Sequence, residues 1–156
     1  MSYIDKSREY YAAHGYEQPY RWAAFDDVPF AALERPLSDC TVAVVTTSFL
    51  HHHDSKFGAP ATGKQVYHHP VAEVPERMFT DDLSWDKGET NTDDTESFLP
   101  LRSLQRLVDA GRIGRLDDRF FGVPTEYSQR KTGLDAEEIA GWCAEDGVDA
   151  VVLVPL

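Results

Sequence analysis

The first candidate for chemistry is a histidine-rich segment in which three imidazoles precede a carboxylate: His51, His52, His53 and Asp54. Imidazole and carboxylate groups are good ligands for zinc and iron. Neighbouring side chains of an extended chain point to opposite sides, so adjacent imidazoles cannot all reach one ion. We therefore consider His51, His53 and Asp54 as ligands of a divalent metal, zinc or iron. A solvated His-rich loop without native metal is the alternative that we prefer.

An acidic segment at residues 80–86, Thr-Asp-Asp-Leu-Ser-Trp-Asp, is the second candidate. Carboxylates and the face of an indole ring both attract cations, so the segment is suited to bind a substituted amine. A charged surface turn is the alternative interpretation, and the spacing does not match a calcium-binding loop. The residues that we expect to contact substrate here are Asp81, Asp82, Trp85 and Asp86.

Three hydroxyl side chains follow a strongly apolar run. Residues 41–50 are nearly all β-branched or apolar, which is typical of a strand covered on both faces. In open α/β sheets, ligands bind just outside the carboxyl ends of the strands. We therefore expect Thr46, Thr47 and Ser48 to contribute to substrate binding together with the acidic segment.

Other catalytic patterns are missing from the sequence. It has no GxSxG nucleophile motif, and the segment 58–64 lacks the hydroxyl residue that follows lysine in a P-loop. The two cysteines, Cys40 and Cys143, form neither a CxxC pair nor a metal-ligand spacing. We interpret Cys143 as a buried small hydrophobe on a helix, and the role of Cys40 stays open. No catalytic residue is assigned from the sequence.

Composition narrows the class of protein. The 156 residues, 42% of them hydrophobic, suffice for one core of ordinary size. A net charge of -12, from 15 basic and 27 acidic residues, argues against nucleic acid as a partner. No apolar run approaches the ~20 residues of a membrane span, and residues 1–6 lack the apolar core of a signal peptide. We expect a cytoplasmic protein.

Helical and strand patterns alternate along the second part of the chain. We predict helices at residues 7–13, from Pro100 to Gly111, and from a capping pattern that begins at Asp135 to Gly147. The last of these helices should bury Ile139, Trp142 and Cys143. We predict strands at residues 41–50, 73–79, 120–123 and 149–156, the last one parallel and buried.

This alternation predicts an α/β fold, a three-layer sandwich with a mostly parallel sheet. Residues 40–156 form this domain, and residues 1–39 form an irregular N-terminal arm rich in aromatic side chains. The arm packs either on the core of its own chain or on another chain. A buried strand at 149–156 would leave a sheet edge for a neighbour to cover, so we expect an oligomer.

Several motifs occur in a characteristic order over most of the chain. They are residues 19–22 (Pro-Tyr-Arg-Trp), 36–37, 42–47, 80–86, 98–101 (Phe-Leu-Pro-Leu), 111–114 (Gly-Arg-Ile-Gly), 121–122 (Phe-Gly) and 145–155. Together they resemble the glycine/sarcosine/betaine/D-proline reductase selenoprotein B family. Each motif is short and none is catalytic alone, so the resemblance depends on their order and spacing.

The resemblance implies an α/β oxidoreductase in which a thiol or selenol attacks a small amine or amino-acid-like substrate, with a disulfide as the electron couple. Longer relatives continue after the last strand with a Cys-Pro-x-Cys segment, whereas this sequence ends at Leu156. We therefore expect a reductase-like subunit, in a homo-oligomer or with a hetero-subunit that supplies the redox cysteine. The alternatives are a metal-dependent enzyme built on His51–Asp54 and a non-catalytic binding or regulatory module.

Overall fold

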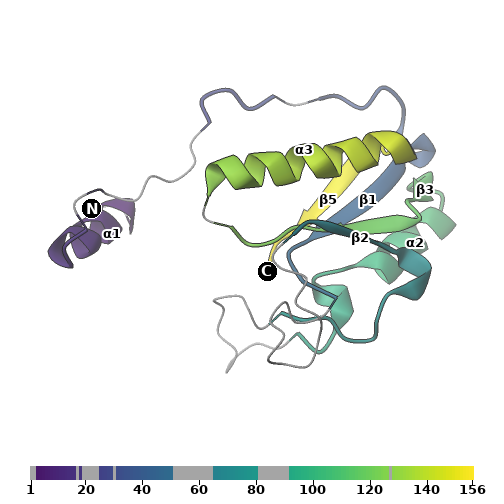
Figure 1. Ribbon diagram of the computed structural model, residues 1–156. Helices are drawn as coiled ribbons and strands as arrows, with labels where there is room; N and C mark the ends of the chain where they lie inside the picture. Colours follow the sequence, from purple (N-terminus) through teal and green to yellow (C-terminus); the bar gives the residue numbers. More distant parts are fainter. Residues whose placement is uncertain are drawn as a thin grey trace. The chain divides into compact units, whose positions relative to one another are not determined.

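The computed structural model of the chain describes residues 3–16, 18, 25–29, 31–50, 65–80, 92–126 and 128–156 (Figure 1). The chain divides into two units, residues 1–31 and 32–156. In the first unit, helix α1 (Tyr3–Ala13) begins four residues before the predicted helix and has no buried residue. Its aromatic side chains contact one another, as between the rings of Tyr10 and Tyr11 at 5.7 Å.

The second unit is built on a mixed, mostly parallel sheet. Its strands are β1 (Thr41–Thr46), β2 (Tyr67–Pro70), β3 (Arg115–Leu116), β4 (Arg119–Gly122) and β5 (Ala150–Val154). Strand β1 is central, because β5 pairs along one of its edges from Val42 to Thr46 and the short strands β3 and β4 share the other. These pairs are parallel, and β2 joins β4 in the antiparallel direction.

Two longer helices cover opposite faces of this sheet, α2 (Leu101–Asp109) and α3 (Gln129–Asp146) (Figure 1). Within the described residues of this unit, the other helical elements are single 3₁₀ turns: η1 (Leu37–Asp39), η3 (Val71–Glu73) and η4 (Thr95–Ser97). The structure therefore confirms the α/β fold with a mostly parallel sheet between two helical layers.

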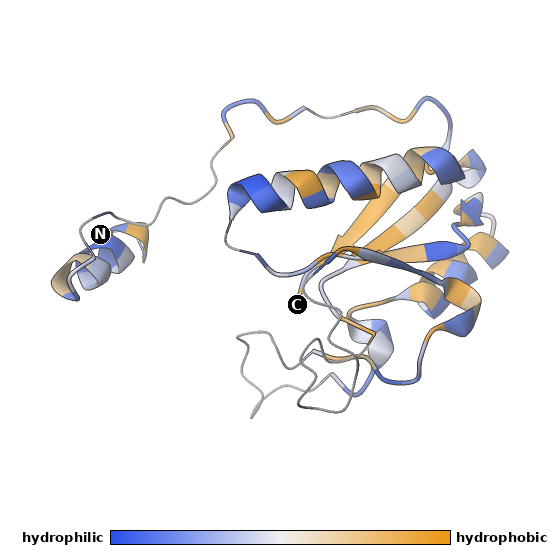
Figure 2. Cartoon of the chain, in the orientation of Figure 1, coloured by the Kyte–Doolittle hydropathy of each residue, from blue (hydrophilic) through white to orange (hydrophobic). Residues whose placement is uncertain are grey.

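The alternation of side chains along β1 produces two apolar clusters, one on each face. Val42 and Val44 pack with Leu101 and Leu104 of α2, and the neighbouring Ala43 and Val45 pack under α3. The apolar strands between the helices are visible in Figure 2. The cluster under α3 contains Ala43, Val45, Phe121, Ile139 and Cys143. Both faces of β1 are covered, as its unbroken apolar sequence predicts.

Strand β5 is parallel as predicted, but the prediction that it is buried is wrong. Among the described residues it pairs only with β1, and its residues Val151 and Leu153 are 39% and 71% exposed. These two residues lie on the face of α3, since they pair with Ala43 and Val45. They are absent from the apolar cluster under α3, so that cluster stops short of the edge strand.

Two further predictions are wrong in detail. Helix α3 begins at Gln129, capped by the Ser128 side chain, which accepts a hydrogen bond from the Lys131 amide. Asp135 therefore lies inside the helix rather than at its start. The segment 73–79 forms no strand, because only Phe79 makes an isolated bridge, to Phe49. No helix in the described part of the chain is long and apolar enough to cross a membrane.

Candidate functional site at the carboxyl edge of the sheet

The parallel strands end together at one edge of the sheet. Thr46, the last residue of β1, is in register with Gly122 of β4 and with Val154 of β5. The backbone continues this arrangement, since the Val123 amide donates to the Thr46 carbonyl at 2.9 Å. This is the edge at which α/β proteins bind ligands, so the predicted hydroxyl residues are placed where a site is expected.

Two of the three hydroxyl residues predicted to bind substrate are fully buried. Thr46 and Ser48 are 0% exposed. The two hydroxyl oxygens lie 3.0 Å apart, and Ser48 Oγ also donates to the Met78 sulfur at 3.7 Å. Thr47 is half-buried, and its hydroxyl accepts a hydrogen bond from the Leu156 amide at 2.9 Å. In this conformation Thr47 is therefore the best placed of the three to reach a ligand.

Tyr67 fixes the backbone just after β1. Its hydroxyl donates to the Ser48 carbonyl at 2.7 Å. Burial raises the pKa of Tyr67 strongly, more than the Ser48 contact lowers it. The phenol therefore stays protonated near neutral pH and acts as a structural donor rather than as a general base.

Two residues that shortly precede the histidine-rich and the acidic segments in sequence, Phe49 and Phe79, meet at this edge. Phe49 and Phe79 form an antiparallel bridge with backbone hydrogen bonds of 2.9 and 2.7 Å. In antiparallel register, Thr80 continues on the side of Ser48. Thr80 Oγ1 and Thr92 Oγ1 lie 2.6 Å apart, which closes the ends of the segment between them.

The predicted contact residues within these segments lie outside the described residues. They are Asp81, Asp82, Trp85 and Asp86 for substrate, and His51, His53 and Asp54 for metal. Over the described ranges, no group of three or more His, Cys, Asp or Glu side chains could hold a metal ion. His69, in β2, instead makes a 2.9 Å hydrogen bond with the Glu73 carbonyl. The metal site at residues 51–54 stays a prediction.

Neither cysteine is suited to nucleophilic attack. Cys40 and Cys143 are free thiols that are 1% and 8% exposed. Cys40 Sγ donates to the Pro36 carbonyl at 3.3 Å. Burial raises the pKa of Cys143, and the nearby carboxylates of Asp117 and Asp146 raise it further. Because the thiolate is the reactive form, the raised pKa makes Cys143 unreactive, while burial keeps Cys40 away from reagents in solution.

Sequence reasoning missed two buried carboxylates, Asp117 and Asp135. They are 3% and 8% exposed, and in each the Oδ2 atom has no hydrogen-bond partner within the described residues. Asp117 follows β3, and its other oxygen accepts from the Asp118 amide at 2.8 Å. Burial raises the pKa of Asp117, and repulsion from Asp146 adds to this effect.

The helical spacing of the sequence could have revealed that Asp135 is buried. It precedes Ile139 and Cys143 by one and two turns, so all three residues share the buried face of α3. The capping pattern that begins at Asp135 pointed instead to a helix start, where a carboxylate is solvated. Asp117 has no comparable signal, since the break between β3 and β4 is not visible in the sequence.

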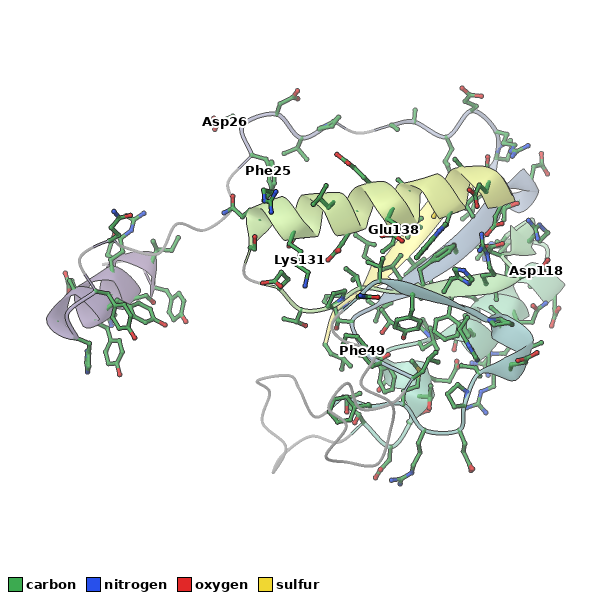
Figure 3. All side chains as sticks on the ribbon, in the orientation of Figure 1. Phe25, Asp26, Phe49, Asp118, Lys131 and Glu138 are labelled. Atoms are coloured by element: carbon green, nitrogen blue, oxygen red, sulfur yellow. The ribbon has the colours of Figure 1, made fainter. Side chains whose placement is uncertain are left out.

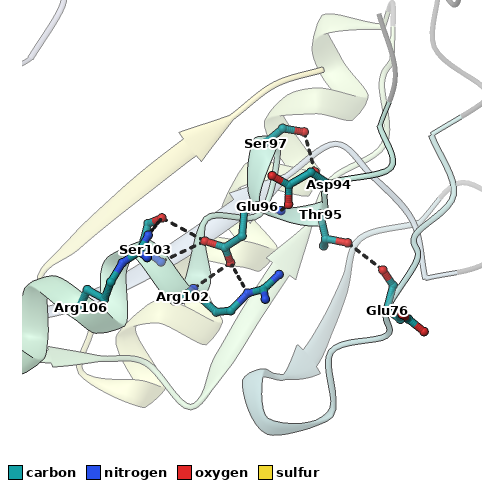
Figure 4. A network of polar contacts seen from close by, with 8 residues as sticks. All are labelled: Glu76, Asp94, Thr95, Glu96, Ser97, Arg102, Ser103 and Arg106. Atoms are coloured by element: carbon teal, nitrogen blue, oxygen red, sulfur yellow. Dashed lines mark hydrogen bonds and ion pairs between the residues drawn. The ribbon is translucent and has the colours of Figure 1, made fainter.

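A groove of about 480 Å³ lies on the face of the sheet that α2 covers, beside the start of that helix. Its lining is mainly apolar, and two of its charged residues, Glu96 and Arg102, pair with each other (Figure 4). The Glu96 carboxylate accepts from the amides of Arg102 and Ser103 at 2.8 and 3.0 Å, and it also pairs with the Arg102 side chain at 3.5 Å. Glu96 thus caps α2 rather than awaiting a ligand.

Comparison with protein-family models, curated proteins and solved structures finds no match to this chain.

Proposed function

We propose that the chain is a cytoplasmic, substrate-binding subunit of a reductase of the glycine/betaine/sarcosine/D-proline type. It would bind a small amine or amino-acid-like substrate at the carboxyl edge of the sheet. The attacking thiol or selenol would come from a partner subunit, in a homo-oligomer or a hetero-oligomer, with a disulfide as the electron couple.

One observation carries the proposal. The antiparallel bridge between Phe49 and Phe79 holds the root of the acidic segment against the carboxyl end of β1. Two sets of candidate substrate contacts that lie more than thirty residues apart in sequence thus start from one place. Carboxylates of the acidic segment, together with the half-buried hydroxyl of Thr47, would suit an ammonium group.

The state of the cysteines supports an external thiol. Cys40 is buried and donates to a backbone carbonyl, and Cys143 is buried with a raised pKa. A reductive step needs an accessible thiolate. The proposal therefore assigns this chain the binding of substrate and assigns the electron couple to its partner.

The experiment compares wild-type assembly with the double variant Thr47→Val/Asp82→Asn. We expect amine-dependent oxidation of an added dithiol to fall at least about tenfold, because a hydrogen bond and a charge are lost at the substrate. The thermal unfolding midpoint should stay within a few degrees. The exposed substitution Ser38→Ala is the matched control. Unchanged turnover in the double variant would refute the proposal.

Metal analysis separates the principal alternative from this proposal. Stoichiometric zinc or iron that survives dialysis and is lost with His53→Ala would favour a metal-dependent enzyme. Purified assembly with neither amine-dependent turnover nor bound metal would favour a binding or regulatory module.

A further inference from the structure

The buried Asp135 is the feature that the fold does not explain. It shares the sheet-facing side of α3 with Ile139 and Cys143, and it is 8% exposed. Ile139 and Cys143 meet the apolar cluster formed with Ala43 and Val45, as such a face should. Asp135 instead places a carboxylate on this face, with Oδ2 unpartnered among the residues that the structure describes.

Asp135 lies toward the carboxyl edge of the sheet. Helix α3 ends at Gly147 beside the amino ends of the strands, where the Asp149 amide donates to the Thr41 carbonyl at 2.9 Å. The helix begins on the side toward which β5 points (Figure 1). At about 1.5 Å per residue, Asp135 is about 18 Å before Gly147. Strand β1 spans a similar length at about 3.3 Å per residue, so Asp135 is level with its end.

The nearest basic side chain on the helix is engaged elsewhere. Lys131, one turn before Asp135 and labelled at the start of α3 in Figure 3, donates to Glu126 Oε2 at 3.0 Å. Arg130 is exposed. A buried carboxylate oxygen without a donor is unfavourable, and a functional site in which a ligand supplies the missing donor is one of its recognised explanations.

Resting on the proposed function, we propose that Asp135 binds the ammonium group of the small amine at the carboxyl edge. An N–H-bearing organic cation supplies both the hydrogen bond and the positive charge that Oδ2 lacks. A metal ion would require further ligands, and the described residues bring no group of three together. Asp135 would thus be a further anchor for the ammonium group, supplied by helix α3 in addition to the carboxylates of the acidic segment.

The chain offers a matched control in Asp117, whose Oδ2 is also buried and unpartnered within the described ranges. Asp117 interacts with Arg115 and Arg119, and it lies near the amino ends of the strands, where its amide donates to the Val42 carbonyl at 2.8 Å. The two residues therefore share burial and charge but differ in position. Only the substitution at Asp135 should weaken binding of the amine.

The experiment titrates the assembled protein with ethylammonium chloride against sodium chloride of equal ionic strength. Binding is followed by the carboxyl carbon resonances of the aspartates and by thermal unfolding. We expect a saturable shift at Asp135 and a raised unfolding midpoint, with affinity at least about tenfold weaker in Asp135→Asn and unchanged in Asp117→Asn. Tetramethylammonium, which has no N–H, should bind more weakly than ethylammonium.

Three other outcomes of this titration would contradict the proposed role of Asp135. Equal affinity in wild type and Asp135→Asn places the amine elsewhere, and equal loss in Asp117→Asn reduces the effect to net charge. Absence of saturable binding in the wild type removes the site. Failure of the proposed function is distinguishable, since it appears as absence of amine-dependent dithiol oxidation while ethylammonium still binds at Asp135.

Discussion

The ring of Tyr67 occupies the space that a Cβ atom on Gly122 would need. The two residues face each other in the antiparallel pair of β2 and β4. The Tyr67 hydroxyl reaches the Ser48 carbonyl, so this contact also fixes the chain just after β1. The glycine of the Phe121-Gly122 motif is therefore explained by packing beside the candidate site, without a direct role in chemistry.

Replacing Gly122 with alanine should destabilise the protein by about 2–4 kcal/mol, because the added methyl group forces the partly buried Tyr67 ring away. Urea unfolding measures the change. Gly141→Ala in α3 is the control, since nothing lies within 4 Å of the position of its Cβ atom. There we expect a gain of up to about 1 kcal/mol from helix propensity. Equal effects at both positions would contradict this packing relationship.

Asp117 should make stability fall as pH rises. Burial and Asp146 raise its pKa in the folded protein above the ordinary value of 3.8. The folded state therefore keeps the proton longer than the unfolded state, and stability is lost as pH rises through the folded pKa. Asp117→Asn should be more stable than wild type by about 1–2 kcal/mol above that pKa.

The difference between wild type and Asp117→Asn should vanish below pH 3.8, where the carboxyl is protonated in both states. Urea unfolding at a series of pH values measures it. A stability difference that is constant with pH would show that the substitution acts by packing rather than by charge.

Glu96 should have the opposite pH dependence. Burial tends to raise its pKa, but hydrogen bonds from the amides of Arg102 and Ser103 outweigh burial and lower it below 4.5. Its stabilising effect is therefore present above pH 4.5 and lost as pH falls through the folded pKa. Glu96→Gln should cost about 0.5–2 kcal/mol at pH 7, as for loss of a helix cap.

Thermal and urea unfolding of Glu96→Gln at pH 7 and at pH 3 test this role. The loss seen at pH 7 should shrink at the lower pH, because the wild-type carboxyl takes up a proton as pH falls through its folded pKa. Asp109→Asn, at the other end of α2, is the control. A loss that does not change between the two pH values would contradict capping by the charged carboxylate.

Cys40 and Cys143 should resist alkylation in the folded protein. Both are buried and therefore poorly accessible to a reagent, and the raised pKa of Cys143 also keeps its reactive thiolate form scarce at pH 7.5. Iodoacetamide followed by mass spectrometry should label both thiols in urea and neither in buffer. Rapid labelling of native Cys40 with loss of turnover would instead move the thiol chemistry into this chain.

Local sequence determined the class of fold and the main elements. The β-branched run at 41–46 specified a covered strand, and helical spacing specified the buried positions of Ile139 and Cys143. Gly147 ends α3 with φ at 69°, as a residue without a side chain allows. These features depend on the spacing of apolar residues and on the backbone preferences of each residue type. Both are properties of short segments, so they can be read from neighbouring residues in the sequence.

The position of the acidic segment was within reach of the sequence only in part. Its residue types predict an attraction for cations, but the position of its first residue, Thr80, near the end of β1 depends on the bridge between Phe49 and Phe79. That pairing joins residues thirty positions apart. The spacing of apolar residues gives no information about contacts between residues so far apart in sequence. The meeting of Phe49 and Phe79 was therefore visible only in the fold.

Tertiary structure alone decided which side chains are placed to contact a ligand. It placed β5 at an edge, because an apolar strand does not encode how many neighbours it will have. It buried Thr46 and Ser48 in hydrogen bonds with each other and left Thr47 half-exposed. It also turned Asp135 toward the sheet, since a buried carboxylate is recognised only once the groups packed around it are known.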